Sequence, residues 1–320
     1  MESGSIIGPN RTFVHHDGAL GDVLLSLAVL REIRNRSSML HFAGRPDMGI
    51  LFRECGLADE ISPAGAARYA PLHSGRIGND LTGFFRAFDH AVLFTVDPSA
   101  QLGTSLSSYI PETAVILTIP PRDKSIHVSD FRSQQFLQLH PPADGRLLPV
   151  PREYQELAGA LLGRLGYDGS APVIAVHPGS GSREKSWPLE RFFAVIDRLR
   201  AANDPFMLLL SGPAEDEALK DRIEAFSRSR QGIAHLSDPD LVTVAALLSA
   251  SDLFIGNDSG AGHLAAAAGC PVLALFGPTD PVLWRPRGRR VEVLAAPALA
   301  EIEVSQVYSR ALSMLAPEKS

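Results

Sequence analysis

The chain has 320 residues, of which 45% are hydrophobic, with a formal net charge of −6 and a pI of about 5.9. This length and apolar content suffice for two ordinary hydrophobic cores, so we expect two domains of similar size. The acidic balance argues against nucleic acid as the main partner. Two cysteines, Cys55 and Cys270, suit a reducing cytoplasm better than a disulfide framework. No signal-peptide core precedes Arg11, and the longest apolar stretch, 264–276, is interrupted and too short to span a bilayer. We therefore expect a soluble protein.

The N-terminal half alternates short apolar runs with amphipathic segments, a pattern typical of strands and helices in turn. The predicted strands are 12–15, 39–43, 91–96 and 115–119, and the predicted helices are 21–34, 48–55 and 127–139. Such alternation implies a parallel sheet covered by helices on both faces.

Two proline-rich stretches, 141–145 and 149–151, separate this pattern from a second one of the same kind. The second half predicts strands at 173–176, 206–210, 253–255 and 272–276, and helices at 153–165, 189–200, 216–227, 241–250, 263–268 and 304–315. We expect an α/β protein of two doubly wound, Rossmann-like domains, 1–150 and 151–320, facing a central cleft. The last helix could pack back on the first domain.

The stretch 253–281 carries the strongest local signal. A buried strand runs through the glycine-rich turn 256–262 into a small-residue helix, and a second strand follows. This arrangement leaves backbone N–H groups unpaired at the positive end of a helix, where a phosphate or diphosphate can bind. The alternative is a tight βαβ unit whose glycines only let the helix approach the sheet.

The segment 17–22 follows the first strand and frames Asp22 with Gly18 and Gly21. An aspartate in a first helical turn stabilises the helix dipole, which is a sufficient structural reason for Asp22. A carboxylate at a glycine-framed strand end could equally act as a general base toward an acceptor hydroxyl.

The segment 177–188 follows the strand at 173–176 and offers hydroxyls, bare amides and the charge of Lys185. This set fits a leaving diphosphate, although a polar loop with a solvated lysine is the alternative. Glu184 stands where a P-loop needs glycine before its lysine, so we exclude an NTPase.

Acidic residues occupy the segment 211–217, after the strand at 206–210. Such residues can accept ribose hydroxyls, but they are also ordinary first-turn helix residues. Asp240 of the Asp238-Pro239-Asp240 sequence is a natural helix cap, so we assign no metal to it.

In order along the chain, three blocks together resemble glycosyltransferase family 9, the heptosyltransferases of lipopolysaccharide core synthesis. The blocks are residues 18–24 (GALGDVL), 177–179 (HPG) with 185–188 (KSWP), and 256–260 (GNDSG) with His263 and 276–281 (FGPTDP). The resemblance implies a GT-B fold with an acceptor domain first and a nucleotide-sugar domain second. It further implies an ADP-heptose-type donor, inversion at the anomeric carbon, and neither metal nor other cofactor.

Carried over by position, the resemblance makes Asp22 the catalytic base. It assigns the donor to Ser180, Gly181, Ser182, Lys185, Asn257, Asp258, Ser259, Gly260, Ala261 and Gly262, and the nucleoside to Glu215 or Glu217. His263 could orient the glycine-rich turn, but a core histidine is equally plausible. The implied acceptor is a glycan or glycolipid, met by a cytoplasmic enzyme that could contact the inner membrane peripherally.

Two other classes remain open. A nucleotide-sugar epimerase or hydrolase on the same frame would need a second acid–base pair, which His15, His16 and Asp17 could supply. A non-catalytic nucleotide-sugar-binding protein is the other alternative, although Asp22 argues against it.

Overall fold

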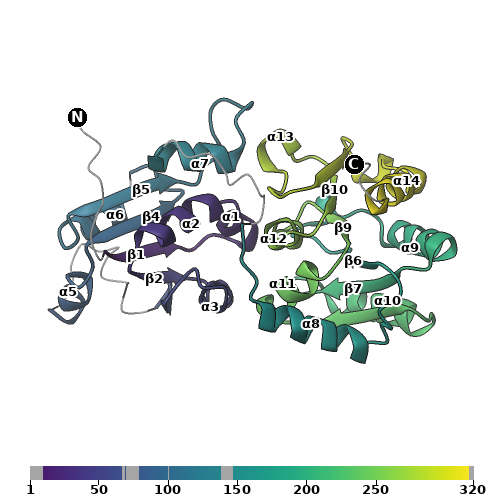
Figure 1. Cartoon of the computed structure of the whole chain (residues 1–320). Coiled ribbons are helices and arrows are strands. Elements are labelled where there is room, and N and C mark those ends of the chain that lie inside the picture. The colour runs from purple at the N-terminus through teal and green to yellow at the C-terminus, as the bar shows by residue number, and fades with distance from the viewer. Residues whose placement is uncertain (1–9, 67–68, 70–78, 100, 138–146, 317–320) are drawn as a thin grey trace. The chain divides into compact units, whose positions relative to one another are not determined.

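In the computed structural model, the chain divides into two compact units, residues 1–142 and 143–320. The structure describes residues 10–66, 69, 79–99, 101–137 and 147–316. The proline-rich stretch 141–145 and the last two residues of the helix predicted over 127–139 fall outside these ranges. Figure 1 shows that each unit is built from strands and helices that alternate along the chain.

The first unit contains a five-stranded parallel sheet in the order β3-β2-β1-β4-β5. Its strands are β1 (Arg11–His16), β2 (Met39–Gly44), β3 (Glu60–Pro63), β4 (His90–Thr95) and β5 (Glu112–Leu117). Its helices are α1 (Leu20–Leu24), α2 (Leu27–Arg36), α3 (Pro46–Glu54), α5 (Asn79–Phe85), α6 (Gln101–Ser107) and α7 (Val128–Leu137). All residues of β1 after Arg11 are buried, as expected for a central parallel strand covered on both faces.

The helix predicted over 21–34 is divided in two by a tight turn at Leu25 and Ser26. The Ser26 N–H donates to the Val23 carbonyl, one residue closer than in an α-helix, and α2 begins immediately afterwards. The Ser26 hydroxyl is buried and bonds to His16 and Arg132. The prediction of one continuous helix is therefore wrong at this turn, because tertiary hydrogen bonds to Ser26 override local helix propensity.

The second unit contains a six-stranded parallel sheet in the order β11-β10-β9-β6-β7-β8. Its strands are β6 (Val173–His177), β7 (Phe206–Ser211), β8 (Ile233–Ser237), β9 (Leu253–Asn257), β10 (Val272–Phe276) and β11 (Val291–Ala295). Its α-helices are α8 (Arg152–Arg164), α9 (Leu189–Asn203), α10 (Glu217–Arg228), α11 (Leu241–Ser249), α12 (Gly260–Ala268), α13 (Pro281–Trp284) and α14 (Val304–Leu315). The 3₁₀ turns are η2 (Arg183–Lys185) and η3 (Leu299–Glu301).

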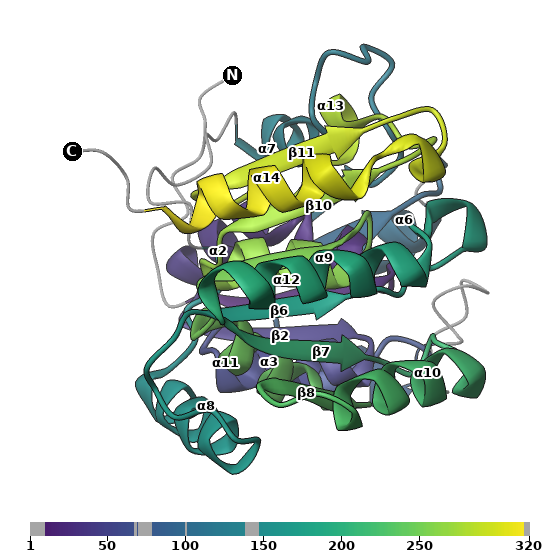
Figure 2. The ribbon, with the colours of Figure 1, turned by 90° about the vertical axis from the view of Figure 1, so that its right-hand side faces the viewer.

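One core of this unit lies between the sheet and the helices α9, α10 and α14. Alternate strand residues such as Ile174, Leu209 and Ile255 pack there against helix residues such as Phe192. Figure 2 shows α9 and α14 in front of the strands. The buried residues of the last helix α14, Val307, Ala311 and Met314, belong to this core.

Within the described ranges, the structure contains no helix with the length and apolar character needed to cross a membrane.

Candidate active-site residues

The two loops predicted to hold a diphosphate begin side by side in the second sheet, because β6 and β9 are neighbours and His177 pairs with Gly256. Asn257 joins the loops. Its Nδ2 donates to the carbonyl oxygens of Pro178 (2.7 Å) and Gly179 (3.3 Å), and its Oδ1 accepts from the Trp187 N–H at 3.0 Å. The buried Asn257 amide is therefore occupied in fastening the loop 178–187 at both ends.

Lys185 reaches from this loop to the start of α12. Its Nζ donates to Asp258 Oδ2 at 3.0 Å. The Lys185 side chain is 38% exposed to solvent, whereas the Asp258 side chain is 8% exposed. Ser259 is the residue before α12, and the N–H groups of Gly260 and Ala261 open the helix. Such first-turn N–H groups have no acceptor inside a helix. A lysine ammonium and the positive end of a nine-residue helix thus converge at the carboxyl ends of β6 and β9.

The other predicted donor-loop residues differ in how far they are engaged. The Ser180 hydroxyl already bonds within its own loop, to the Ser182 carbonyl (2.5 Å) and the Ser186 hydroxyl (2.8 Å). Gly181 and Ser182 are exposed. In α12, Gly262 and His263 are buried, and His263 retains 7% of its exposure. Ser180 therefore shapes the loop, whereas the exposed Gly181 and Ser182 are accessible to a ligand.

The structure separates the two glutamates proposed for the nucleoside. Glu215 folds back over the β6 loop, where a Cβ on Gly179 would lie 2.0 Å from Glu215 Oε1, and its Oε2 accepts from the Gly212 N–H at 2.6 Å. Glu217 points away into an 84% exposed position and pairs with Lys220. Of the two, Glu215 alone lies beside the loop 178–187 that is predicted to hold the donor.

The environment of Glu215 favours its charged form. Burial alone would raise the pKa of the Glu215 carboxyl, but His177, with Nε2 3.6 Å from Oε2, and the Gly212 amide together hold that pKa below its ordinary value. The carboxyl is therefore ionised at neutral pH, and its side chain retains 4% exposure.

Asp22 lies in α1, just beyond the carboxyl end of β1 in the first unit. Arg132 of α7 donates from Nη2 to Asp22 Oδ1 at 3.0 Å, and from Nη1 to the Asp22 carbonyl at 2.5 Å. The Arg132 side chain is fully buried, whereas that of Asp22 keeps 40% of its exposure. Asp22 is thus a held but solvent-accessible carboxylate, compatible with a base.

The hydrogen bonds around His16 fix its protonation. The Gly18 N–H donates to His16 Nδ1 at 3.2 Å, so the proton sits on Nε2, which donates to Ser26 Oγ at 3.1 Å. Burial, with Arg132 and His15 nearby, lowers the pKa of His16 well below its usual value. His16 is neutral, 1% exposed, and bonded at both nitrogens, so it does not offer the second acid–base group that an epimerase would need.

Sequence reasoning missed Arg132 and the His16–Ser26 hydrogen bond. Arg132 belongs to a correctly predicted helix, but its partner Asp22 lies 110 residues earlier. The sequence feature that could have indicated Arg132 is its position near Ser129 and Ser133 on one helix face. These three residues form a buried polar face on α7.

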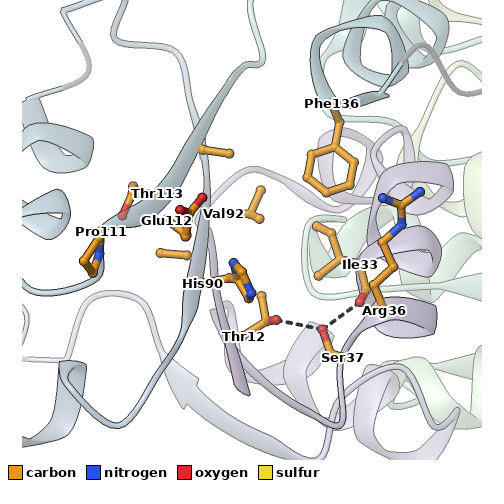
Figure 3. A pocket seen from close by; sticks show the side chains of 12 residues that line it. Thr12, Ile33, Arg36, Ser37, His90, Val92, Pro111, Glu112, Thr113 and Phe136 are labelled. Carbon is orange, nitrogen blue, oxygen red and sulfur yellow. Dashed lines mark hydrogen bonds between the residues drawn. The ribbon is translucent and has the colours of Figure 1, made fainter. Parts of the chain in front are cut away.

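A pocket of about 190 Å³ lies at the amino-terminal edge of the first sheet, opposite the edge that carries Asp22. Figure 3 shows Ile33 and Phe136 on one side of it and His90 and Thr12 on another. It is lined by Thr12, Ile33, Arg36, Ser37, His90, Ala91, Val92, Pro111, Glu112, Thr113, Ala114 and Phe136. None of the predicted site residues lines it.

Two doubly wound units, each built on a parallel sheet, define the GT-B fold class. The sequence model of glycosyltransferase family 9 (heptosyltransferase) matches residues 149–310, about half of the chain. The chain belongs to glycosyltransferase family 9.

Known proteins agree with this assignment. Lipopolysaccharide heptosyltransferase 3 of Escherichia coli K12 is 34% identical over 113 residues, which are 35% of this chain and 33% of that protein. The chain thus spans about a third of the length of this relative. A family 9 glycosyl transferase structure from Veillonella parvula aligns with a TM-score of 0.77 at 19% identity, covering 97% of this chain and 99% of that one. The structure of E. coli ADP-heptose lps heptosyltransferase II aligns with a TM-score of 0.75 at 17% identity. This alignment covers 95% of this chain and 98% of that one. These two likenesses establish the fold.

Proposed function

We propose that this chain is an inverting, metal-independent heptosyltransferase that moves a heptose from ADP-heptose to a hydroxyl of a lipopolysaccharide-core acceptor. Family membership supports the reaction class, and similarity to lipopolysaccharide heptosyltransferases supports the sugar and the acceptor class. The observation that carries the proposal is the convergence of Lys185 with the first turn of α12. A cation and unpaired N–H groups at one place are what a leaving diphosphate requires.

In this mechanism Asp22 accepts the proton of the acceptor hydroxyl as its oxygen bonds to the anomeric carbon. The bond from that carbon to the diphosphate breaks, and its electron pair leaves with ADP. Attack from the face opposite the leaving group inverts the anomeric configuration, as in other single displacements assisted by a carboxylate base. General-base assistance contributes about 10²–10⁴-fold to such a step.

The donor is held by residues of the second unit. Lys185 carries three N–H donors, so it can keep its bond to Asp258 and still contact a phosphate oxygen. The N–H groups at the start of α12 and the N–H of the exposed Gly181 would bind the remaining phosphate oxygens. The Glu215 carboxylate would accept hydrogen bonds from the ribose hydroxyls. Lys185 and the backbone N–H groups together stabilise the negative charge that develops on the leaving diphosphate, without requiring a metal ion.

The proposed setting follows from the acceptor. A glycolipid acceptor would be met at the surface of the inner membrane, with the donor supplied from the cytoplasm.

The test is a transfer assay with the purified protein in EDTA. ADP-heptose is offered with lipopolysaccharides truncated before the first, second or third heptose, and NMR identifies the product and its anomeric configuration. We expect one acceptor to gain an inverted heptose with stoichiometric ADP release. Conversion of ADP-heptose without acceptor would indicate an epimerase or hydrolase, and ADP binding without turnover would indicate a binding protein. Either result would contradict the proposal.

A further inference from the structure

Arg132 is a buried cation that donates four hydrogen bonds through its two terminal nitrogens. Besides the two bonds to Asp22, its Nη1 donates to Ser26 Oγ at 3.0 Å and its Nη2 to the Thr118 carbonyl at 3.1 Å. These acceptors come from α1, the turn before α2, and the segment after β5. Figure 1 shows α7 lying along α2, and the two helices are in contact.

Stability alone is a weak reason to place a guanidinium here. Removing a charge from water costs several kcal/mol, and a buried ion pair is often no more stable than apolar residues of similar size. The Arg132 Nε has no hydrogen-bond partner in the described structure, so the burial is not even fully compensated. Asp22 is the one carboxylate bonded to it among the described residues. The contacts of Arg132 therefore point to Asp22.

The bonds of Arg132 restrict Asp22 in two ways. The carboxylate is held by one oxygen only, since Oδ1 accepts from Nη2 while Oδ2 accepts no hydrogen bond from the described residues. The backbone is held as well, because Nη1 binds the Asp22 carbonyl, and the Ser26 hydroxyl donates to the same carbonyl at 3.2 Å. One oxygen is anchored and the other stays open to an incoming hydroxyl.

His16 completes the support from the side of β1. Its Nε2–H donates to Ser26 Oγ, and its ring stacks on Phe94 with centroids 4.6 Å apart. Ser26 thus accepts from His16 and Arg132 and donates to Asp22, so each of its hydrogen-bonding groups is used consistently. The end of β1, the segment after β5 and helix α7 thus supply the groups that hold α1 and the Leu25–Ser26 turn in place.

We propose that Arg132 is a positioning residue for transfer: it anchors Asp22 Oδ1, so that Oδ2 faces the acceptor hydroxyl in a fixed orientation. The inference rests on the proposed role of Asp22 as base. A misplacement of about 1 Å at a reacting group can cost about 10²-fold in rate. Loss of Arg132 should therefore act on turnover, while the donor-binding residues, all in the second unit, are untouched.

A double-mutant cycle tests this assignment. Arg132→Gln, Asp22→Asn and the double variant are compared with wild type for kcat and for the KM of ADP-heptose, using the acceptor that wild type accepts. We expect Arg132→Gln to lower kcat about 10²-fold with an unchanged donor KM. Arg132→Lys should recover part of this loss, because its ammonium can still reach Asp22. In the Asp22→Asn background, Arg132→Gln should cost nothing further, since a residue that acts through Asp22 has nothing left to position. The exposed Arg122 supplies the control Arg122→Gln, with wild-type kinetics expected.

The outcomes separate the two proposals. Wild-type kcat in Arg132→Gln, or an equal loss with and without the Asp22 carboxylate, would overturn the positioning role while leaving Asp22 as base. Full transfer by Asp22→Asn would overturn the base itself. If Arg132→Gln does not fold, Arg132→Lys replaces it in the cycle, because it keeps a cation beside Asp22 but changes the geometry of the anchor. A loss of kcat that occurs when Asp22 is present but not in the Asp22→Asn chain would then support the proposal. An equal loss in both chains would contradict it.

Discussion

The loops around Lys185 and the segment around Asp22 both follow buried parallel strands, yet different kinds of residue hold them. The segments that carry Lys185, Asn257 with Asp258, and Glu215 contact each other, and the first two of them carry recognisable motifs. Asp22 is held by Arg132, from a helix with no motif at all. The family match, 149–310, likewise covers the donor loops and omits Asp22. Local motifs thus sufficed to predict the proposed donor site, whereas the setting of the proposed base depends on the folded first unit.

Among effects on stability and binding, the largest is expected at Asp22. Asp22→Ala leaves the buried Arg132 without its counter-charge, so we expect a loss of about 3 kcal/mol in the free energy of unfolding. Asp22→Asn retains an acceptor for Nη2 and should lose distinctly less. Urea titration of both variants measures the difference. Equal stability of the two would show that Arg132 is held by its other acceptors, and would weaken the contrast between the two regions.

Lys185 gives the corresponding test in the donor loops. Lys185→Met removes a charge-assisted contact to phosphate, worth about 1.5–3 kcal/mol, so ADP should bind about 10- to 100-fold more weakly by calorimetry. Lys124→Met, at an exposed position of the first unit, is the matched control and should bind normally. An unaltered ADP affinity in Lys185→Met would remove this lysine from the donor site.

The two glutamates after β7, Glu215 and Glu217, test which side chain contacts the nucleoside. Glu215→Gln should weaken ADP binding about tenfold, because an ionised acceptor is replaced by a neutral one. Glu217→Gln should have no effect, since Glu217 is exposed and paired with Lys220. The reverse order of effects would place the nucleoside on α10 rather than over the β6 loop.

The smallest expected effect is the pH dependence contributed by His16. Its folded pKa is depressed, chiefly by burial, so below about pH 6.5 the unfolded chain binds more protons than the folded chain. The free energy of unfolding should therefore fall as the pH drops through that value, by up to about 1.4 kcal/mol per pH unit. His16→Gln should flatten this slope between pH 6.5 and 5. An unchanged slope in His16→Gln would contradict the buried neutral state.

Much of the fold could be predicted because central parallel strands are continuous apolar runs. Strands such as β1, β7 and β10 are buried along nearly their whole length and were readily predicted. The strands β3, β8 and β11 were missed, and each is an edge strand with one neighbour. An edge strand is partly exposed and so has a mixed composition; the β3 sequence even contains serine and proline.

The candidate site could be predicted only in part, for a related reason. The types and spacing of residues indicated Lys185 and the turn before α12, because phosphate chemistry is local to a loop and a helix end. The sequence could not choose between Glu215 and Glu217, since the choice depends on which side chain folds back over Gly179. Nor could it indicate Arg132, whose role depends on α7 being packed against α2.

The most direct test of the account is the rate of heptose transfer by Asp22→Asn, measured beside its affinity for ADP. The account predicts a fall in kcat of about 10²–10⁴-fold with ADP binding unchanged, because the side chain keeps its hydrogen bond to Arg132 but can no longer take a proton. Transfer at the wild-type rate by a folded Asp22→Asn variant would contradict it.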